Sequence, residues 1–235
     1  MNLAPLRLAA ACLVGAVLLA GCGEADGASA GTASPTPNGI ADQPAEAILT
    51  TARDLAEQQT SMRLKGKGRC GETPFQADMR LRQDGTGAGT VVLGSHTLQL
   101  VGTSDAVYVK GPEVFWTDEA DAKTAARIGD RWVKGAHASN PCLTALSSFS
   151  NVLENYLGYP GTPVKEPSVG IFGVPAQLLS ISPDVSIWIR TVDTPLPVWV
   201  SVPSTETTVA LGEWGADVAV TVPAADETVD AATLT

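Results

Sequence analysis

The chain has few of the residues that metal sites and most catalytic centres depend on. Of its 235 residues only two are histidines, His96 and His137, and aromatic residues make up 5%. Neither histidine has a cysteine or carboxylate at ligand spacing, so the sequence predicts no metal site. It also has no G-x-S-x-G, Ser-x-x-Lys, P-loop or G-x-G-x-x-G motif. We therefore expect no enzyme and no cofactor.

Long apolar runs are missing except at the start of the chain. Arg7 precedes an apolar run over residues 8–20, which is the pattern of a secretory signal and is too short for a spanning helix. The next residues, Leu-Ala-Gly-Cys at 19–22, resemble the lipobox of bacterial lipoproteins. That resemblance implies a signal peptide over residues 1–21, cleavage before Cys22 and a diacylglyceryl group on its thiol. The alternative is an ordinary signal followed by a chance cysteine.

Residues 23–43 lack aromatic side chains and consist mainly of Gly, Ala, Ser, Thr and Pro. Such a segment cannot bury enough apolar surface to offset its ordering entropy. We predict that residues 22–43 form a lipidated N-terminus with a disordered tether. The protein is then held by lipid alone on the extracytoplasmic side of the cell membrane, since several acyl chains bind a bilayer far better than one.

Basic residues are outnumbered in this chain. The formal net charge is −10, with 15 Lys and Arg against 25 Asp and Glu, and it becomes −11 when Arg7 leaves with the signal. An acidic protein is a poor binder of nucleic acid, so no nucleic-acid partner is expected. Residues 44–235 are enough for one domain with a real core, and we expect a monomer.

Cysteine is scarce as well, which narrows the possible disulfides. Of the four cysteines, Cys12 leaves with the signal and Cys22 carries lipid. Cys70 and Cys142 remain, in an oxidising compartment where disulfides persist. We predict a bridge between them; the alternative is two separately buried thiols.

The pattern along residues 44–235 predicts an α+β fold. An amphipathic helix starts at Pro44, alternating strands occupy residues 62–110, and a further extended segment is expected at 115–117. Helices are then predicted over 119–128 and 141–157, followed by strands that end with one at 216–222. We expect one large antiparallel sheet whose inner face is covered by the helices.

With this plan the chain resembles the actinobacterial LppX/LprG lipoproteins and, more distantly, the lipoprotein carrier LolA. The resemblance is carried by the lipobox with its tether and by four segments: Thr-Ser-Met-Arg-Leu at 60–64, Tyr-Val-Lys-Gly at 108–111, Phe-Trp-Thr at 115–117 and Ile-Gly-Asp-Arg-Trp-Val-Lys at 128–134. It implies a single strongly curved antiparallel sheet, a half-barrel, with helices covering its concave face. Related proteins enclose between these layers an apolar cavity that holds acyl chains.

The inner face of the first strand gives modest support for such a cavity. It carries Gly66 and Gly68 where a packed core usually has branched side chains, and glycine in a strand often marks a close approach of another group. The alternative is that a helix or sheet curvature takes up the space, and that the other positions are plain core. The candidate lining residues are Leu64, Gly66, Gly68, Met79, Leu81, Leu98, Leu100, Leu146, Phe149 and Leu153.

A row of basic side chains is predicted on the opposite face of the same strands. On an acidic protein this row is a candidate strip for lipid headgroups or an acidic partner, and the alternative is a solvated sheet face. Trp188 and Trp199 lie on the polar side of their strands, where exposed aromatic rings can mark a partner surface. The basic row consists of Arg63, Lys65, Lys67, Arg69, Arg80 and Arg82.

Two functions remain open at this point. The first is a lipid-anchored protein of the cell envelope that binds an acyl chain or lipid between sheet and helices, for carriage or presentation. The second is a lipid-anchored interaction or sensor protein with a filled core. A cavity of several hundred Å³ favours the first, and ordinary packing density throughout favours the second.

Overall fold

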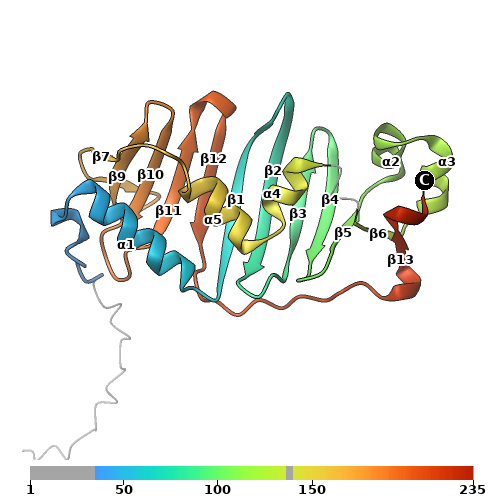
Figure 1. Cartoon of the computed structure of the whole chain (residues 1–235), viewed down its shortest axis with the longest axis horizontal. Coiled ribbons are helices and arrows are strands. Elements are labelled where there is room, and N and C mark those ends of the chain that lie inside the picture. The colour runs from blue at the N-terminus through green and yellow to red at the C-terminus, as the bar shows by residue number, and fades with distance from the viewer. Residues whose placement is uncertain (1–34, 136–139, 235) are drawn as a thin grey trace, which may run out of the picture. The chain divides into compact units, whose positions relative to one another are not determined.

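The computed structural model describes residues 35–135 and 140–234 (Figure 1). The predicted signal peptide, Cys22 and the tether up to residue 34 lie outside the described residues, as does His137. The last part of the predicted tether, residues 35–43, is ordered instead: Pro37 bridges to Val192 and Ile40–Asp42 form a short 3-10 helix. The prediction is wrong there because Ile40 packs into the core, where it is 2% exposed.

Thirteen strands form one sheet that does not close on itself. All neighbours are antiparallel except β13 and β6. The predicted α+β class with one curved antiparallel sheet is confirmed. In sheet order the strands are β13 (Thr228–Asp230), β6 (Trp132–Lys134), β5 (Val107–Lys110), β4 (His96–Gly102), β3 (Gly87–Leu93), β2 (Thr73–Arg82), β1 (Ser61–Cys70), β12 (Thr207–Gly212), β11 (Pro197–Val202), β10 (Val185–Arg190), β9 (Val174–Ser182) and β7 (Val164–Lys165), with β8 (Val169–Ile171) also paired to β9.

Helices α1, α4 and α5 lie over one face of the sheet, which we call the inner face (Figure 1). Helices α2 and α3 lie at the end of the sheet beside β5 and β6 (Figure 1). We call the uncovered face the outer face. The helices are α1 (Ala45–Glu57), α2 (Glu113–Glu119), α3 (Ala122–Ile128), α4 (Pro141–Leu146) and α5 (Phe149–Leu157).

Helix α1 forms where its sequence predicts. Pro44 stands at the N-cap with extended backbone, which its fixed φ favours. Ile48, Leu49, Ala52 and Ala56 are buried along one stripe, because residues three and four apart share a helix face. That stripe holds α1 against the sheet.

Two predicted segments near residue 115 are wrong. Residues 115–117 are helical, within α2, because Pro112 stands at a helix N-cap and Glu113 supplies a carboxylate in the first turn. The helix expected over 119–128 begins later, as α3. Its N-cap is Asp121, whose side chain accepts a hydrogen bond from the Thr124 backbone N–H at 2.8 Å.

The helix predicted over 141–157 is two helices. Asn140 caps the first as predicted, accepting from the Leu143 N–H. Ser148 then caps α5 by accepting from the Asn151 N–H at 3.2 Å, and an N-cap residue has extended backbone that interrupts a helix.

The strand predicted over 216–222 is absent. Its valine pattern is that of a strand, yet only Val218 is buried and Val222 is 49% exposed. Strand β1, whose Ser61 carbonyl oxygen accepts from the Gly215 N–H at the start of this segment, is already paired with β2 and β12. Without a free edge the segment has no ladder to join.

Candidate functional site

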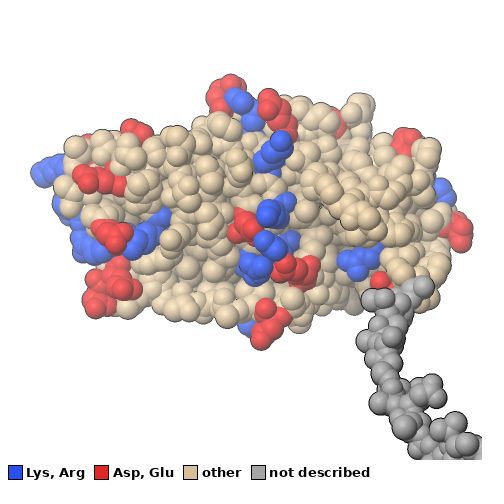
Figure 2. Space-filling view, turned by 180° about the vertical axis from the view of Figure 1, so that it is seen from behind, with Lys and Arg blue, Asp and Glu red and all other residues tan. Residues whose placement is uncertain are grey.

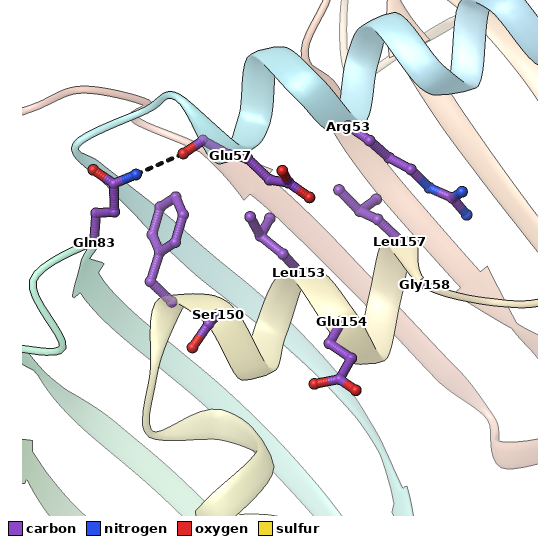
Figure 3. A pocket seen from close by; sticks show the side chains of 9 residues that line it. Arg53, Glu57, Gln83, Ser150, Leu153, Glu154, Leu157 and Gly158 are labelled. Atoms are coloured by element: carbon purple, nitrogen blue, oxygen red, sulfur yellow. Dashed lines mark hydrogen bonds between the residues drawn. The ribbon is translucent and has the colours of Figure 1, made fainter.

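A hollow of about 670 Å³ lies between α1 and α5 on the inner face (Figure 3). Figure 3 shows Leu153 and Leu157 pointing from α5 toward α1, and Arg53 and Glu57 reaching down from α1. Gln83 closes one end, where its side-chain amide donates to the Glu57 carbonyl oxygen at 2.7 Å. We call this space the inner hollow. Its lining residues are Arg53, Glu57, Gln83, Phe149, Ser150, Leu153, Glu154, Leu157 and Gly158.

The apolar wall of the inner hollow follows from the stripe on α5. Phe149, Leu153 and Leu157 recur at four-residue spacing and are 4%, 8% and 2% exposed, so they share one face of the helix. The Phe149 ring also packs edge-on to Trp214, with centroids 6.4 Å apart. The wall is therefore apolar, and one end of it packs against a second aromatic ring.

The rim of the inner hollow is polar and carries both signs of charge. The Arg53 guanidinium donates through Nη2 to the Tyr159 carbonyl oxygen at 3.5 Å. Its Nε is buried, and among the described residues it has no hydrogen-bond partner. An unsatisfied buried donor costs free energy until an acceptor reaches it. Arg53 also lines the hollow, so its guanidinium places a positive charge beside the apolar wall.

Two tyrosines at the C-terminal end of α5 stay neutral. Burial raises the pKa of Tyr156 to about 12, and burial also raises the pKa of Tyr159. Both phenols keep their protons at neutral pH.

Eight of the ten predicted lining residues fall into two groups, according to whether they border the inner hollow. Phe149 and Leu153 line the inner hollow. A second group is 1% exposed or less and borders neither this hollow nor the one on the outer face described below: Leu64, Met79, Leu81, Leu98, Leu100 and Leu146. These side chains fill the space between the sheet and its helical layer.

The two candidate glycines meet the neighbouring strand instead. A Cβ on Gly66 would collide with the Thr208 carbonyl oxygen, and one on Gly68 would collide with the Thr207 side chain. Strand β12 takes the space that side chains would occupy, so both glycines permit its close approach.

A disulfide joins Cys70 and Cys142, whose Cα atoms are 5.9 Å apart. Cys70 is the last residue of β1 and Cys142 lies in the first turn of α4. The bridge ties the helical layer to the sheet, one helix away from the wall of the inner hollow.

The basic row on the outer face is largely neutralised by ion pairs. Arg63 donates to Asp78 at 2.6 Å and to Glu213 at 2.7 Å, and these bonds hold the pKa of both carboxyl groups below their usual range. Lys67 is the member of the row that has no ion pair among the described residues. Figure 2 shows positive and negative side chains side by side over the middle of this face. The other pairs are Lys65–Asp78, Arg69–Glu72, Arg69–Glu206, Arg80–Glu213 and Arg82–Asp84.

A second hollow, of about 510 Å³, lies on the outer face. Its floor is made by β1, β2, β3 and β12, with Lys65 and Lys67 beside it. At one end the ring of Phe172 packs against Trp199, with centroids 4.9 Å apart. Sequence reasoning singled out Trp199 but missed Phe172, although Phe-Gly between two apolar stretches is a turn signal. We call this space the outer hollow.

Residues 35–135 and 140–234 contain neither a metal-binding cluster nor a membrane-spanning helix. No group of three or more His, Cys, Asp or Glu is placed to hold a metal ion. None of the helices in these ranges is both long and apolar enough to cross a membrane.

The fold is a half-barrel whose inner face is covered by helices. No family model and no curated protein matches the chain. Among solved structures, LprF from Mycobacterium bovis is similar with a TM-score of 0.53 and 15% identity, over 80% of this chain and 99% of LprF. This likeness confirms the fold that the resemblance to LppX/LprG lipoproteins implied.

Two further solved structures match less well. An uncharacterized conserved protein from Thermus thermophilus has a TM-score of 0.40 and 12% identity, over 80% of this chain and 99% of that one. MucB in a complex with MucA from Pseudomonas aeruginosa has a TM-score of 0.34 and 13% identity, over 77% of this chain and 59% of that one.

Proposed function

We propose that the protein is a cell-envelope lipoprotein that binds an acyl chain in the inner hollow, for carriage or presentation. The observation that carries this proposal is the hollow itself: about 670 Å³ between α1 and α5, with Phe149, Leu153 and Leu157 as its wall. Ligand sites usually measure about 300–1,000 Å³ and are mainly apolar. Binding needs no covalent chemistry, because each buried methylene contributes about 0.8 kcal/mol.

Arg53 gives the ligand an orientation. Its guanidinium lies at the rim of the hollow, while the wall below is apolar. A chain that ends in a carboxylate or phosphate fills both requirements, since guanidinium groups bind such oxygens strongly. We therefore expect an acidic amphiphile, such as a fatty acid or an anionic phospholipid.

The same proposal places the protein at a membrane. Cleavage after residue 21 and lipid on Cys22 would leave the domain on a short tether at the extracytoplasmic surface. Cys22→Ala is expected to release the protein from membranes into the soluble fraction. Unchanged membrane retention of this variant would reject the anchor.

Native mass spectrometry of the mature chain, purified from its own host in mild detergent, tests the ligand. We expect a lipid-sized adduct beyond the covalent anchor, lost in Leu153→Trp because the indole fills the hollow. Arg53→Gln should weaken binding of an anionic amphiphile, whereas Lys123→Gln, which removes one exposed positive charge on α3, should not. If wild-type protein carries no adduct and takes none up, the ligand proposal is wrong.

One observation favours the alternative, an anchored interaction or sensor protein with a filled core. Six of the ten predicted lining residues are 1% exposed or less, so the space directly beneath α4 is packed. The alternative predicts that Leu153→Trp changes stability alone. The adduct measurement therefore separates the two functions.

A further inference from the structure

The hairpin formed by β8 and the start of β9 is apolar and exposed. Residues 167–175, Pro-Ser-Val-Gly-Ile-Phe-Gly-Val-Pro, contain no charged side chain. Phe172 at its tip is 77% exposed, and Val169 is 42% exposed. Val164 on the adjoining strand β7 is 56% exposed. Of the five large hydrophobic side chains that are strongly exposed among the described residues, three lie at this edge of the sheet.

The backbone at the tip makes phenylalanine an unusual choice. Phe172 has φ +50° and Gly173 has φ +79°, the conformation of a two-residue hairpin turn that favours Asn-Gly or Gly-Gly. A bulky side chain in the left-handed region is disfavoured. The ring gains little burial in return. It remains 77% exposed, and its aromatic contact is an edge-type packing with Trp199. Such an outlier points to a function for the side chain.

The N-terminal end of the described chain lies beside the base of this hairpin. The Asp193 N–H donates to the Thr36 carbonyl oxygen at 2.9 Å, and Pro37 forms a bridge with Val192. The neighbouring Thr191 N–H donates to the carbonyl oxygen of Pro175 at 3.0 Å. Pro175 pairs with Gly170 across the hairpin. The chain therefore enters the domain next to the apolar edge.

Chain length then limits how far this edge can be from the membrane. Pro35 follows Cys22 by 13 residues, which span ~45 Å at full extension. If Cys22 holds lipid, as the proposed function requires, the bilayer surface lies within reach of the hairpin.

We propose that the β8–β9 hairpin is a membrane-contact element that places Phe172 in the interfacial layer of the bilayer holding the lipid anchor. An aromatic ring on an uncharged hairpin suits that layer, where apolar side chains leave water beside the headgroups. Val164 and Val169 extend the contact along the edge. Together with the tether, the hairpin fixes the orientation of the domain on the membrane, which a tether alone leaves free.

Site-directed probes on the mature, lipidated chain test this proposal. Phe172→Cys is labelled with a polarity-sensitive bimane, and the protein is reconstituted in vesicles of phosphatidylcholine and phosphatidylglycerol with and without brominated acyl chains. The matched control is Val114→Cys on α2, which is 54% exposed at the other end of the sheet. We expect brominated lipid to quench the Phe172→Cys probe at least twofold and to leave the control unchanged.

Each other outcome overturns the proposal in a recognisable way. If the protein floats with the vesicles and neither probe is quenched, or both are quenched equally, the hairpin is not a specific contact. If the Phe172→Cys probe is shielded from water in native membranes but not in pure lipid vesicles, the hairpin binds a protein partner. If the chain does not float at all, the anchor itself is wrong. Loss of the ligand adduct in mass spectrometry leaves this experiment unaffected.

Discussion

The inner and outer faces of the sheet are stabilised in different ways. On the inner face, Met62 and Leu64 of β1 are 1% and 0% exposed beneath the helical layer. On the outer face, Arg63 and Lys65 of the same strand reach a shared carboxylate on Asp78. Because successive side chains of a strand point to opposite faces, one strand supplies an apolar layer and an ionic one. The inner face is stabilised by apolar burial, and the outer face carries a layer of ion pairs.

This difference separates the candidate sites as well. The inner hollow has an apolar wall and a charged rim, which suits a single amphiphilic molecule. The outer hollow ends at Phe172 and Trp199, and Phe172 belongs to the hairpin beside which the chain enters the domain. A change on one face should therefore affect one site and spare the other.

Removal of the disulfide is expected to have the largest effect, on the inner face. The Cys70→Ser, Cys142→Ser double variant frees a loop of 72 residues, for which chain entropy gives about 4 kcal/mol as an upper estimate. Urea unfolding should show the loss, and reductant should reproduce it in wild type. Amide exchange should speed up more in α4 and α5, next to the bridge, than in β8 and β9. Equal acceleration on both sides would show that the faces are not independent.

A methyl group at Gly66 is the next largest change, since it acts between the paired strands β1 and β12. Its Cβ would collide with the Thr208 carbonyl oxygen, so β12 must move, at a cost of about 2 kcal/mol by the usual penalty for overpacking. Gly212→Ala is the matched control on β12 because its Cβ meets open space. We expect its free energy of unfolding to change by about 0.5 kcal/mol or less. Equal effects at both positions would contradict the close approach of β12.

The sheet could be predicted from sequence because its strands alternate so clearly. In β2, Phe75, Ala77, Met79 and Leu81 are buried as the alternation requires. The predictions were wrong where the outcome depended on a pairing strand or on a helix cap and not on the local pattern alone. Residues 216–222 alternate like a strand but have no free edge beside them. Ser147 ends α4 and Ser148 caps α5, so two helices interrupt what looks like one continuous apolar stripe.

The candidate site was predicted less completely, for a physical reason. Phe149 and Leu153 carry the signature of an apolar helix face, so they were found. Arg53 and Glu57 are ordinary polar residues of α1, and their place at the rim depends on how α1 lies beside α5. Likewise the pairing of Arg63 with Glu213, 150 residues apart, depends on tertiary structure and is not visible in a local pattern.

Asp78→Asn tests the ionic layer of the outer face, with a moderate effect. Hydrogen bonds from Arg63 lower the pKa of Asp78 in the folded state. Its stabilising contribution is therefore present above the unfolded pKa of about 4 and is lost as pH falls through the lower folded pKa. Because the pair is partly exposed, we expect about 0.5–1 kcal/mol at pH 7.

Urea unfolding from pH 7 to 2 measures this contribution. The stability of wild type should fall more steeply below pH 4 than that of Asp78→Asn. Asp217→Asn serves as the control, an exposed aspartate without an ion pair among the described residues. Parallel curves for wild type and Asp78→Asn would mean that the carboxylate contributes nothing.

Phe172→Asn should have the smallest effect on stability. What matters in this test is whether the free energy of unfolding rises or falls. Asparagine tolerates the left-handed backbone at this turn, which relieves about 1–2 kcal/mol for a bulky residue. The variant loses the edge contact with Trp199, worth about 0.5–1.5 kcal/mol. We expect the free energy of unfolding to rise by about 0.5 kcal/mol in urea titrations, with the inner hollow unaffected. A decrease of more than about 1 kcal/mol would show that the ring stabilises the fold, and the turn would then need no membrane contact to account for its phenylalanine.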